Sequence, residues 1–550
     1  MLAHEPPATE ADIPGAQLHT CMTELEWLHQ IQVANGKQPA WPFVDYLEFE
    51  FVKWMVVNDI SQTAQDKLIK LPIIATCCNL SFSSNYLLNK MLDKLPSAGP
   101  CWKCIEKKII GTLKNSKGQF LTEDIEIWVR DIIEVVKELI GNSAYGKQLV
   151  FVPQKIFLDA EKQNQKIDEM WTANWWSRIQ ELLPPGATVV PIILSSDATQ
   201  LTNFSGGKSA WPVYISIGNI PKHICAKVNS HSTLLLAYLP VPKLDCFRPK
   251  EQGDQKAWIF HQCMELIVAP LKQAGIDGIE MDCGDGYVWH CFPILAAYIA
   301  DNPEQTLIAC CRQNLCHICT VKFDQHQNPP NNPFPLRHPK HTAHALMAQD
   351  IGHTPCLFDE QGLKPFGKPF WAELPHCNIF TCLTPDILHQ LHKGVFKDHL
   401  MNWCLELIKQ TSPENSAEDV DHCYKQMPCH TDLHHFLSGV TKLKQSTANE
   451  HKEMQKVFIG VMAGLVPSDV LPVIVATLDF IYYACLPTHT TETLNLLQHA
   501  LETFHFHKHV FIKYGICTDF NINKIHAMSH YFMAIWELGS ADGYNTETPE

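Results

Sequence analysis

The chain has 550 residues, of which 46% are hydrophobic and 18% charged, a composition that supports a large buried core and excludes an intrinsically disordered protein. Its formal net charge of −15 excludes a protein that coats nucleic acid along its whole length, so any such contact requires a local basic patch. The N-terminus lacks the basic and apolar segments of a secretion signal, and the most apolar stretch, 471–486, contains Asp479 and is too short for a membrane span. We therefore expect neither a secreted nor a membrane protein.

Cysteine, histidine and arginine are present in unusual proportions. The chain contains 22 Cys and 29 His, but only five of its 43 basic residues are Arg. Decay of methylated CpG dinucleotides converts Arg codons into Cys, Trp, His or Gln codons and would leave this composition, and ordinary compositional drift is the alternative. Because the cysteines are scattered, we expect most of them to be buried free thiols and only a few to be metal ligands.

The predicted elements form a helical front, a mixed α/β centre and a helical back. In chain order, the predicted parts are a loose leader at 1–40, a helical N-terminal region at 41–180, an α/β core at 181–323, a Pro- and His-rich linker at 324–384, a mostly helical region at 385–539 and a short end at 540–550. The helical prediction for the second part rests on apolar residues spaced three and four apart, including Ile125, Trp128, Val129 and Ile132.

The central part changes from helical to strand periodicity. Short β-rich runs at 188–194, 211–217 and 234–239 are separated by Gly, Pro, Asn and Ser, and they predict three strands. A helix at about 255–274 and a further strand at 290–300 follow. Three strands, a helix and a fourth strand is the order of an RNase H-like core. The predicted fold class is therefore α/β, with an RNase H-like mixed sheet, a helical N-terminal region and a large, mostly helical insertion.

Two aspartates follow predicted strands directly. Asp197 ends the first run, and Asp301 ends the fourth strand. Carboxylates that leave neighbouring strands can converge at one edge of a sheet and hold a pair of Mg²⁺ or Mn²⁺ ions, which serve phosphodiester cleavage by activating water and stabilising the leaving oxygen. An Asp at the end of a strand is also a common turn former or helix N-cap, and spacing alone leaves that alternative open.

A candidate zinc site combines two short motifs. Cys316 and Cys319 form a C-x2-C pair, which can supply two thiolates to a tetrahedral Zn²⁺ ion. His389 and His392, three residues apart on one predicted helix face, can complete a Cys2His2 site. The alternative is that the histidines pack or cap a helix and the cysteines are buried thiols. The pair at 101 and 104 has the same spacing but no evident partners, so we expect no zinc there.

Several long motifs, in the same order along the chain, resemble those of Plavaka transposases, which belong to fungal CACTA-related DNA transposons. The motifs are MWTANWW at 170–176, GATVVPIILSSDATQL at 186–201, KSAWPVYISIGNI at 208–220, PILAAYIADNPEQ at 293–305, TPDILHQLHKGVF at 384–396 and FNINKIH at 520–526. The resemblance extends from about Trp41 to Glu550.

The resemblance implies a nuclear DDE-type transposase that cleaves and joins DNA at transposon ends with Mg²⁺ or Mn²⁺. It places Asp197 and Asp301 on the first two catalytic carboxylates. The third is expected in the segment 544–550, where Glu550 is favoured over Glu547, and Glu492 at a predicted helix start is the plainer alternative. The implied partner is transposon-end DNA, no membrane is involved, and a homo-oligomer is left open.

The sequence departs from the Plavaka pattern in three ways. It stops at Glu550, where a bracing helix would begin, and it lacks the N-terminal C2H2-like finger of longer relatives. After Lys222, His223 and Cys225 stand where the pattern has a pair of arginines. These departures lead us to expect a truncated and inactive copy. The alternative function is a catalytically dead or domesticated remnant that binds nucleic acid or protein.

Overall fold

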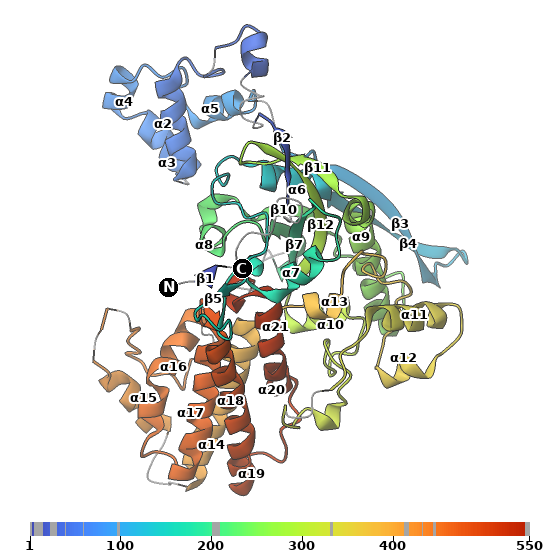
Figure 1. Cartoon of the computed structure of the whole chain (residues 1–550), viewed down its shortest axis with the longest axis vertical. Coiled ribbons are helices and arrows are strands. Elements are labelled where there is room, and N and C mark those ends of the chain that lie inside the picture. The colour runs from blue at the N-terminus through green and yellow to red at the C-terminus, as the bar shows by residue number, and fades with distance from the viewer. Residues whose placement is uncertain are drawn as a thin grey trace.

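The computed structural model shows a mixed α/β protein with three regions (Figure 1). A small group of helices lies at the top, a curled mixed sheet in the middle and a bundle of long helices at the bottom. The structure describes residues 3–4, 15–22, 30–38, 40–58, 60–95, 99–200, 209–330, 334–411, 417–428, 430–431, 433–443 and 447–544. No helix in this described part has the length and apolar character that crossing a membrane requires.

The central sheet has the strand order β11-β12-β7-β9-β10-β4-β3, with β2 added to β12 and β8 to β9. Its strands are β2 (Gln17–Thr20), β3 (Lys103–Lys114), β4 (Phe120–Val129), β7 (Thr188–Ser196), β8 (Thr199–Gln200), β9 (Ser209–Ile217), β10 (Leu234–Leu239), β11 (Ile279–Asp282) and β12 (Tyr287–Ile299). β7 and β12 are parallel, and the other pairings are antiparallel. The strands predicted at 188–194, 211–217, 234–239 and 290–300 are confirmed.

Helices cover both faces of the sheet centre. A parallel pair such as β7 and β12 needs a long crossover, and the helix α9 (Pro249–Asp277) supplies it, which confirms the helix predicted at about 255–274. α9 and α6 (Ile132–Gly141) pack on one face, and α7 (Asn174–Gln180) packs against β7 on the other. Ile192 and Leu194 of β7 are completely buried, as both-face coverage requires.

The helical prediction for 41–180 is wrong in part. It holds for α6 and for four helices near the N-terminus, but residues between them form the long hairpin β3–β4. On β4 the buried residues Ile125, Ile127 and Val129 alternate with exposed ones, which is strand periodicity. The apolar spacing used for the prediction combined the end of this strand with Ile132 at the start of α6, whose N-cap is Asp131.

The N-terminal helices pack around a core of their own. They are α2 (Tyr46–Val57), α3 (Gln62–Ile69), α4 (Pro72–Cys77) and α5 (Asn85–Leu92). Phe43, Met55 and Leu88 are buried at their centre. Within the predicted leader 1–40, strand β2 pairs with β12, so this described stretch belongs to the sheet rather than to a loose leader. A second, small sheet joins β1 (Ala3–His4), β5 (Ile156–Phe157), β6 (Gln165–Ile167) and β13 (His489–Thr490).

The region predicted as a linker, 324–384, is packed structure instead. It contains α11 (Pro339–Asp350), α12 (Cys356–Glu360) and α13 (Ile379–Cys382). Phe370 and Trp371 are buried in the same core as α9, and Trp371 donates a hydrogen bond from Nε1 to the carbonyl oxygen of Ile308 at 2.8 Å. Its aromatic residues therefore extend the core beside the sheet, although the Pro and His content resembles a loop.

The helical region predicted at 385–539 is observed as the bundle at the bottom of Figure 1. It consists of the π-helix η4 (Ile387–Met401) and the helices α14 (Asn402–Thr411), α15 (Ala417–Gln426), α16 (Ala448–Met462), α17 (Leu471–Ala484), α18 (Thr491–His507), α19 (Val510–Lys513), α20 (Asn523–Ala527) and α21 (Tyr531–Leu538). Its core is continuous with the sheet face that α7 covers, and α21 packs on α7. The last helix of the bundle, α21, therefore lies next to the helix that covers the sheet.

Candidate active site

Asp197 and Asp301 lie at the same edge of the central sheet. β7 and β12 are parallel neighbours, and Ser195 of β7 lies opposite Ile299 of β12. Each aspartate comes two residues later, just beyond the end of its strand. The structure therefore places this pair at the ends of neighbouring strands, as expected from the sequence.

Asp301 is fixed by the helix that it begins. It is the N-cap of α10 (Asn302–Ile308), and its side chain accepts a hydrogen bond from the backbone N–H of Glu304 at 2.9 Å. Burial raises the pKa of the Asp301 carboxyl, the negative charges of Asp197 and Asp386 raise it further, and His389 lowers it. The Asp301 carboxyl thus lies within electrostatic reach of two other acids and one imidazole.

Asp386 orients His389 beside this group. Asp386 caps the N-terminus of the π-helix η4, where one of its carboxylate oxygens accepts from the backbone N–H of His389 at 2.8 Å. The other oxygen lies 2.9 Å from Nδ1 of the same histidine. The Asp386 side chain is fully buried, and its backbone oxygen accepts from the hydroxyl of Tyr531 at 3.2 Å.

Glu304 is a buried acid next to the pair that sequence reasoning did not single out. Burial raises the pKa of its carboxyl to about 8, and the charges of Asp301 and Asp197 also raise it. Its carboxyl accepts hydrogen bonds from the hydroxyl of Ser196 and from Nε1 of Trp211, the latter at 3.2 Å. Asp301 and Glu304 have the spacing of a helix capping box. This spacing predicts a helix start from the sequence, but it does not predict that the Glu304 side chain is buried.

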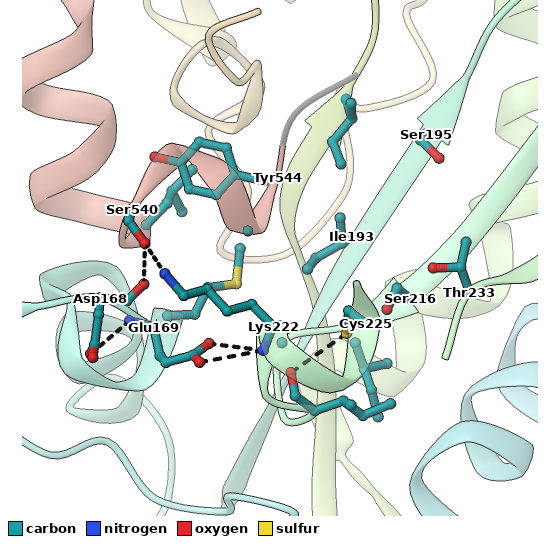
Figure 2. Close-up of a pocket in the computed structure, with 17 residues that line it drawn as sticks. Asp168, Glu169, Ile193, Ser195, Ser216, Lys222, Cys225, Thr233, Ser540 and Tyr544 are labelled. Carbon is teal, nitrogen blue, oxygen red and sulfur yellow. Dashed lines mark hydrogen bonds between the residues drawn. The ribbon is translucent and has the colours of Figure 1, made fainter. Parts of the chain in front are cut away.

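A small pocket lies along β7 and β12 and is lined by Ser195 and Ile299, the residues two positions before Asp197 and Asp301 (Figure 2). Glu169, Lys222 and Tyr544 line it from other segments. Burial raises the pKa of Glu169 to about 7, even though its carboxylate accepts from the backbone N–H of Lys222 at 3.2 Å.

The side chain of Lys222, in the helix α8 (Lys222–Cys225), ties the last described segment to this pocket. Its Nζ donates to the hydroxyl of Ser540 at 2.5 Å (Figure 2). The same Nζ lies 2.8 Å from the carboxylate of Asp542. The described chain ends at Tyr544, whose side chain is buried. The predicted carboxylates Glu547 and Glu550 lie outside the described residues.

Comparison with known proteins now identifies the family. Residues 82–404 match the model of a family described as Plavaka transposase, which is more than half of the chain. The chain belongs to the Plavaka transposase family. The match contains Asp197, Asp301, Glu304 and the pair Asp386–His389. No curated protein matches the chain. Membership of a transposase family implies binding to DNA and use of a divalent metal ion.

The histidine partners expected for the cysteine pair of this Plavaka chain are wrong. Cys316 and Cys319 lie together with His526 and His530, and the four ligand atoms are all within 4.8 Å of one another. His389 lies beside Asp386 instead, and Nδ1 of His392 is 3.0 Å from the side-chain oxygen of Gln455. The missed signal was the spacing of His526 and His530, four residues apart in a short helical stretch.

The remaining candidates of the Plavaka chain lie elsewhere. Cys101 and Cys104 are exposed at the start of the hairpin and belong to no metal-competent group among the described residues. Glu492 is exposed in the first turn of α18, where Thr490 is the N-cap. This position agrees with the plainer reading of Glu492 as a residue at a helix start.

Proposed function

We propose that this Plavaka protein is a DDE-type transposase that cuts DNA at transposon ends and joins it to a target, with its first two carboxylates on an RNase H-like core. The strand order supports the core assignment. β10, β9 and β7 form an antiparallel run, and β12 lies parallel beside β7 after the crossover helix α9. The proposal places the protein in the nucleus, where its DNA substrate is.

The observation that carries this proposal is the convergence of Asp197 and Asp301 at one sheet edge. Carboxylate oxygens are the ligands that Mg²⁺ and Mn²⁺ prefer. The pKa of Asp301 is raised by burial and by the charge of Asp197, so the two carboxylates repel each other in the absence of a cation. The donor set therefore fits a divalent ion. When bound, the ion would supply the activation of water and the stabilisation of the leaving oxygen in DNA cleavage.

The chain's own residues have distinct parts in this proposal. Asp197 and Asp301 hold the ion, and the hydrogen bond from Glu304 keeps the Asp301 carboxyl in place. In its protonated form, His389, oriented by Asp386 through Nδ1, can donate a hydrogen bond from Nε2 to a phosphate oxygen of the DNA. We assign the third carboxylate to Glu550 or Glu547, because the buried Tyr544 brings the chain to the pocket beside Ser195 and Ile299 just before them.

The test is Mn²⁺-dependent cleavage of duplex DNA carrying the transposon ends by the full chain. In place of the inactive copy expected from the sequence, we expect cleavage by the unmodified protein, because the two converging aspartates are present. We expect a loss of more than a hundredfold in Asp197→Asn, because even a ~1 Å misplacement of a reacting group can cost about a hundredfold in rate. The control is Asp124→Asn, an exposed aspartate on β4, three strands away from β7. DNA binding without cleavage in the unmodified protein would instead support the catalytically dead remnant.

Asp386→Asn is expected to reduce cleavage about 10- to 100-fold, the usual cost of removing a group that orients a residue of a metal centre. Asparagine can still cap η4, but it removes the carboxylate oxygen 2.9 Å from Nδ1 of His389. The half-saturating Mn²⁺ concentration should rise along with the fall in rate, because the variant also removes a negative charge that acts on the Asp301 carboxyl. Asp398→Asn is the control, because this aspartate lies on the same π-helix and pairs with Lys524 at the surface. Equal losses in both variants would refute the positioning role.

A further inference from the structure

Four metal-ligating side chains meet at a point that the proposed DNA chemistry does not use. Sγ of Cys316 lies 3.3 Å from Nε2 of His530, and Sγ of Cys319 lies 3.2 Å from Nε2 of His526. The two Nε2 atoms are 3.3 Å apart. Each of these four atoms therefore has another candidate ligand atom within 3.3 Å.

We propose that Cys316, Cys319, His526 and His530 bind one zinc ion in a tetrahedral Cys2His2 site. Zn–S bonds of about 2.3 Å and Zn–N bonds of about 2.0 Å separate neighbouring ligand atoms by roughly 3.3 to 3.8 Å. The observed separations of 3.2 and 3.3 Å agree with this within a few tenths of an ångström. A direct hydrogen bond between thiol and imidazole would explain each sulfur–nitrogen distance by itself. It would not explain why the Nε2 atoms of His526 and His530 also lie close to each other.

The backbone of the C-x2-C turn is folded around the sulfur of Cys316. The N–H groups of Ile318 and Cys319 both point to Sγ of Cys316, at 3.3 and 3.4 Å. These two contacts hold the sulfur at its position beside His530. Arg337, itself buried, fixes the same loop by donating from Nε to the carbonyl oxygen of Cys316 at 2.9 Å.

The site is closed and therefore structural rather than catalytic. Cys316 and Cys319 are 2% and 0% exposed, His526 is 5% exposed, and His530 is partly exposed. The ring of His326 stacks on His526 with centroids 5.2 Å apart, and Phe334 packs against the same imidazole. Four protein ligands leave no open position for water or substrate, which is the arrangement of structural zinc sites.

The proposed ion would join two segments that are about 200 residues apart in the sequence. The cysteines follow α10, the helix that Asp301 begins, and the histidines lie in α20 and just after it, at the end of the helical insertion. Near the site, the side-chain amide of Asn523 lies 3.3 Å from that of Asn302, next to Asp301. Tyr531, directly after His530, contacts Asp386. Zinc would thus hold the returning end of the insertion against the candidate active site.

The first test is the zinc content of the full chain purified under reducing conditions, measured by plasma mass spectrometry. We expect one zinc per chain, loss of zinc in Cys319→Ser and His526→Ala, and retention in His526→Cys, which keeps a ligand at that position. Cys311→Ser and His392→Ala should keep one zinc, because Cys311 is a buried thiol outside the group and His392 is one of the histidines predicted from sequence.

A second measurement covers variants that fold poorly. Co²⁺ added to the chelator-treated unmodified chain should give the visible absorption of a tetrahedral ion with two thiolates, and one equivalent of Zn²⁺ should abolish it. Zinc retained at one equivalent in both Cys319→Ser and His526→Ala would overturn the proposal. An unmodified chain that neither contains zinc nor takes up Zn²⁺ or Co²⁺ would also overturn it. Neither result depends on DNA cleavage, so the zinc site and the proposed function can fail separately.

Discussion

Asp301→Asn is expected to raise the unfolding temperature of the metal-free protein at neutral pH while reducing Mn²⁺-dependent cleavage more than a hundredfold. Burial and the charge of Asp197 raise the pKa of the Asp301 carboxyl above the ordinary value of 3.8. A carboxyl with a raised pKa in the folded state destabilises the fold once the pH exceeds its unfolded value, because the charged form is disfavoured there. Asparagine removes this charge and remains a good N-cap for α10.

Thermal unfolding with and without Mn²⁺ tests this expectation. The stabilisation by Asp301→Asn should be present at pH 7 and should disappear as the pH falls toward 3.8, where the carboxyl of the unmodified protein becomes protonated in both states. Mn²⁺ should raise the unfolding temperature of the unmodified protein but not that of the variant, because an ion that binds only the folded state stabilises it. A variant that is less stable at pH 7, or that Mn²⁺ stabilises equally, would contradict the metal assignment.

The sheet centre and the aspartate pair could be predicted because their signals are local. β7 and β12 are buried on both faces, so their sequences are nearly continuous apolar runs, and an aspartate follows each run. The parallel pairing follows from the long helix between them, since parallel strands require such a crossover. The order of the elements was therefore enough to predict that Asp197 and Asp301 lie at the same edge of the sheet.

The hairpin β3–β4 was missed because its apolar residues are few and run directly into those of α6. Only every second residue near the end of β4 is buried, and Trp128, which looked like part of a helix face, is 43% exposed. Predicted periodicity cannot separate two short elements when only two residues, here Arg130 and the N-cap Asp131, lie between them. The same limit applies to Glu304, since its spacing from Asp301 is visible in the sequence but its burial is not.

The histidine partners of the cysteine pair depended on long-range folding. Histidines three or four residues apart on a helix can both bind one ion, so His389 with His392 and His526 with His530 fit equally well by spacing. The structure distinguishes them by the path of the helical region, which brings α20 back to the loop after α10. No local signal in a chain with 29 histidines ranks one pair above the other.

Glu304→Gln is expected to stabilise the protein relative to the unmodified chain. This gain in stability should be larger at pH 8 than at pH 5. Burial raises the pKa of Glu304 from 4.5 to about 8 in the folded protein. The folded state then holds a proton that the unfolded state releases, so the stability that this group contributes is complete below pH 4.5 and is lost as the pH rises toward 8. The loss is about 1.4 kcal/mol per pH unit in that window, or roughly 3 kcal/mol by pH 7.

Urea unfolding of the two proteins at pH 5, 6.5 and 8 measures this difference. Glutamine carries one donor and one acceptor, as a protonated carboxyl does, so it can keep a hydrogen bond with Nε1 of Trp211 and remain neutral at every pH. The variant should be within about 1 kcal/mol of the unmodified protein at pH 5 and more stable by about 4 kcal/mol at pH 8. Glu373→Gln is the control, because two lysines lower the pKa of Glu373 to about 2 and it is ionised throughout this range. A stability difference for Glu304→Gln that does not grow with pH would show that this carboxyl is ionised in the folded protein, and that the edge of the sheet carries three negative charges instead of two.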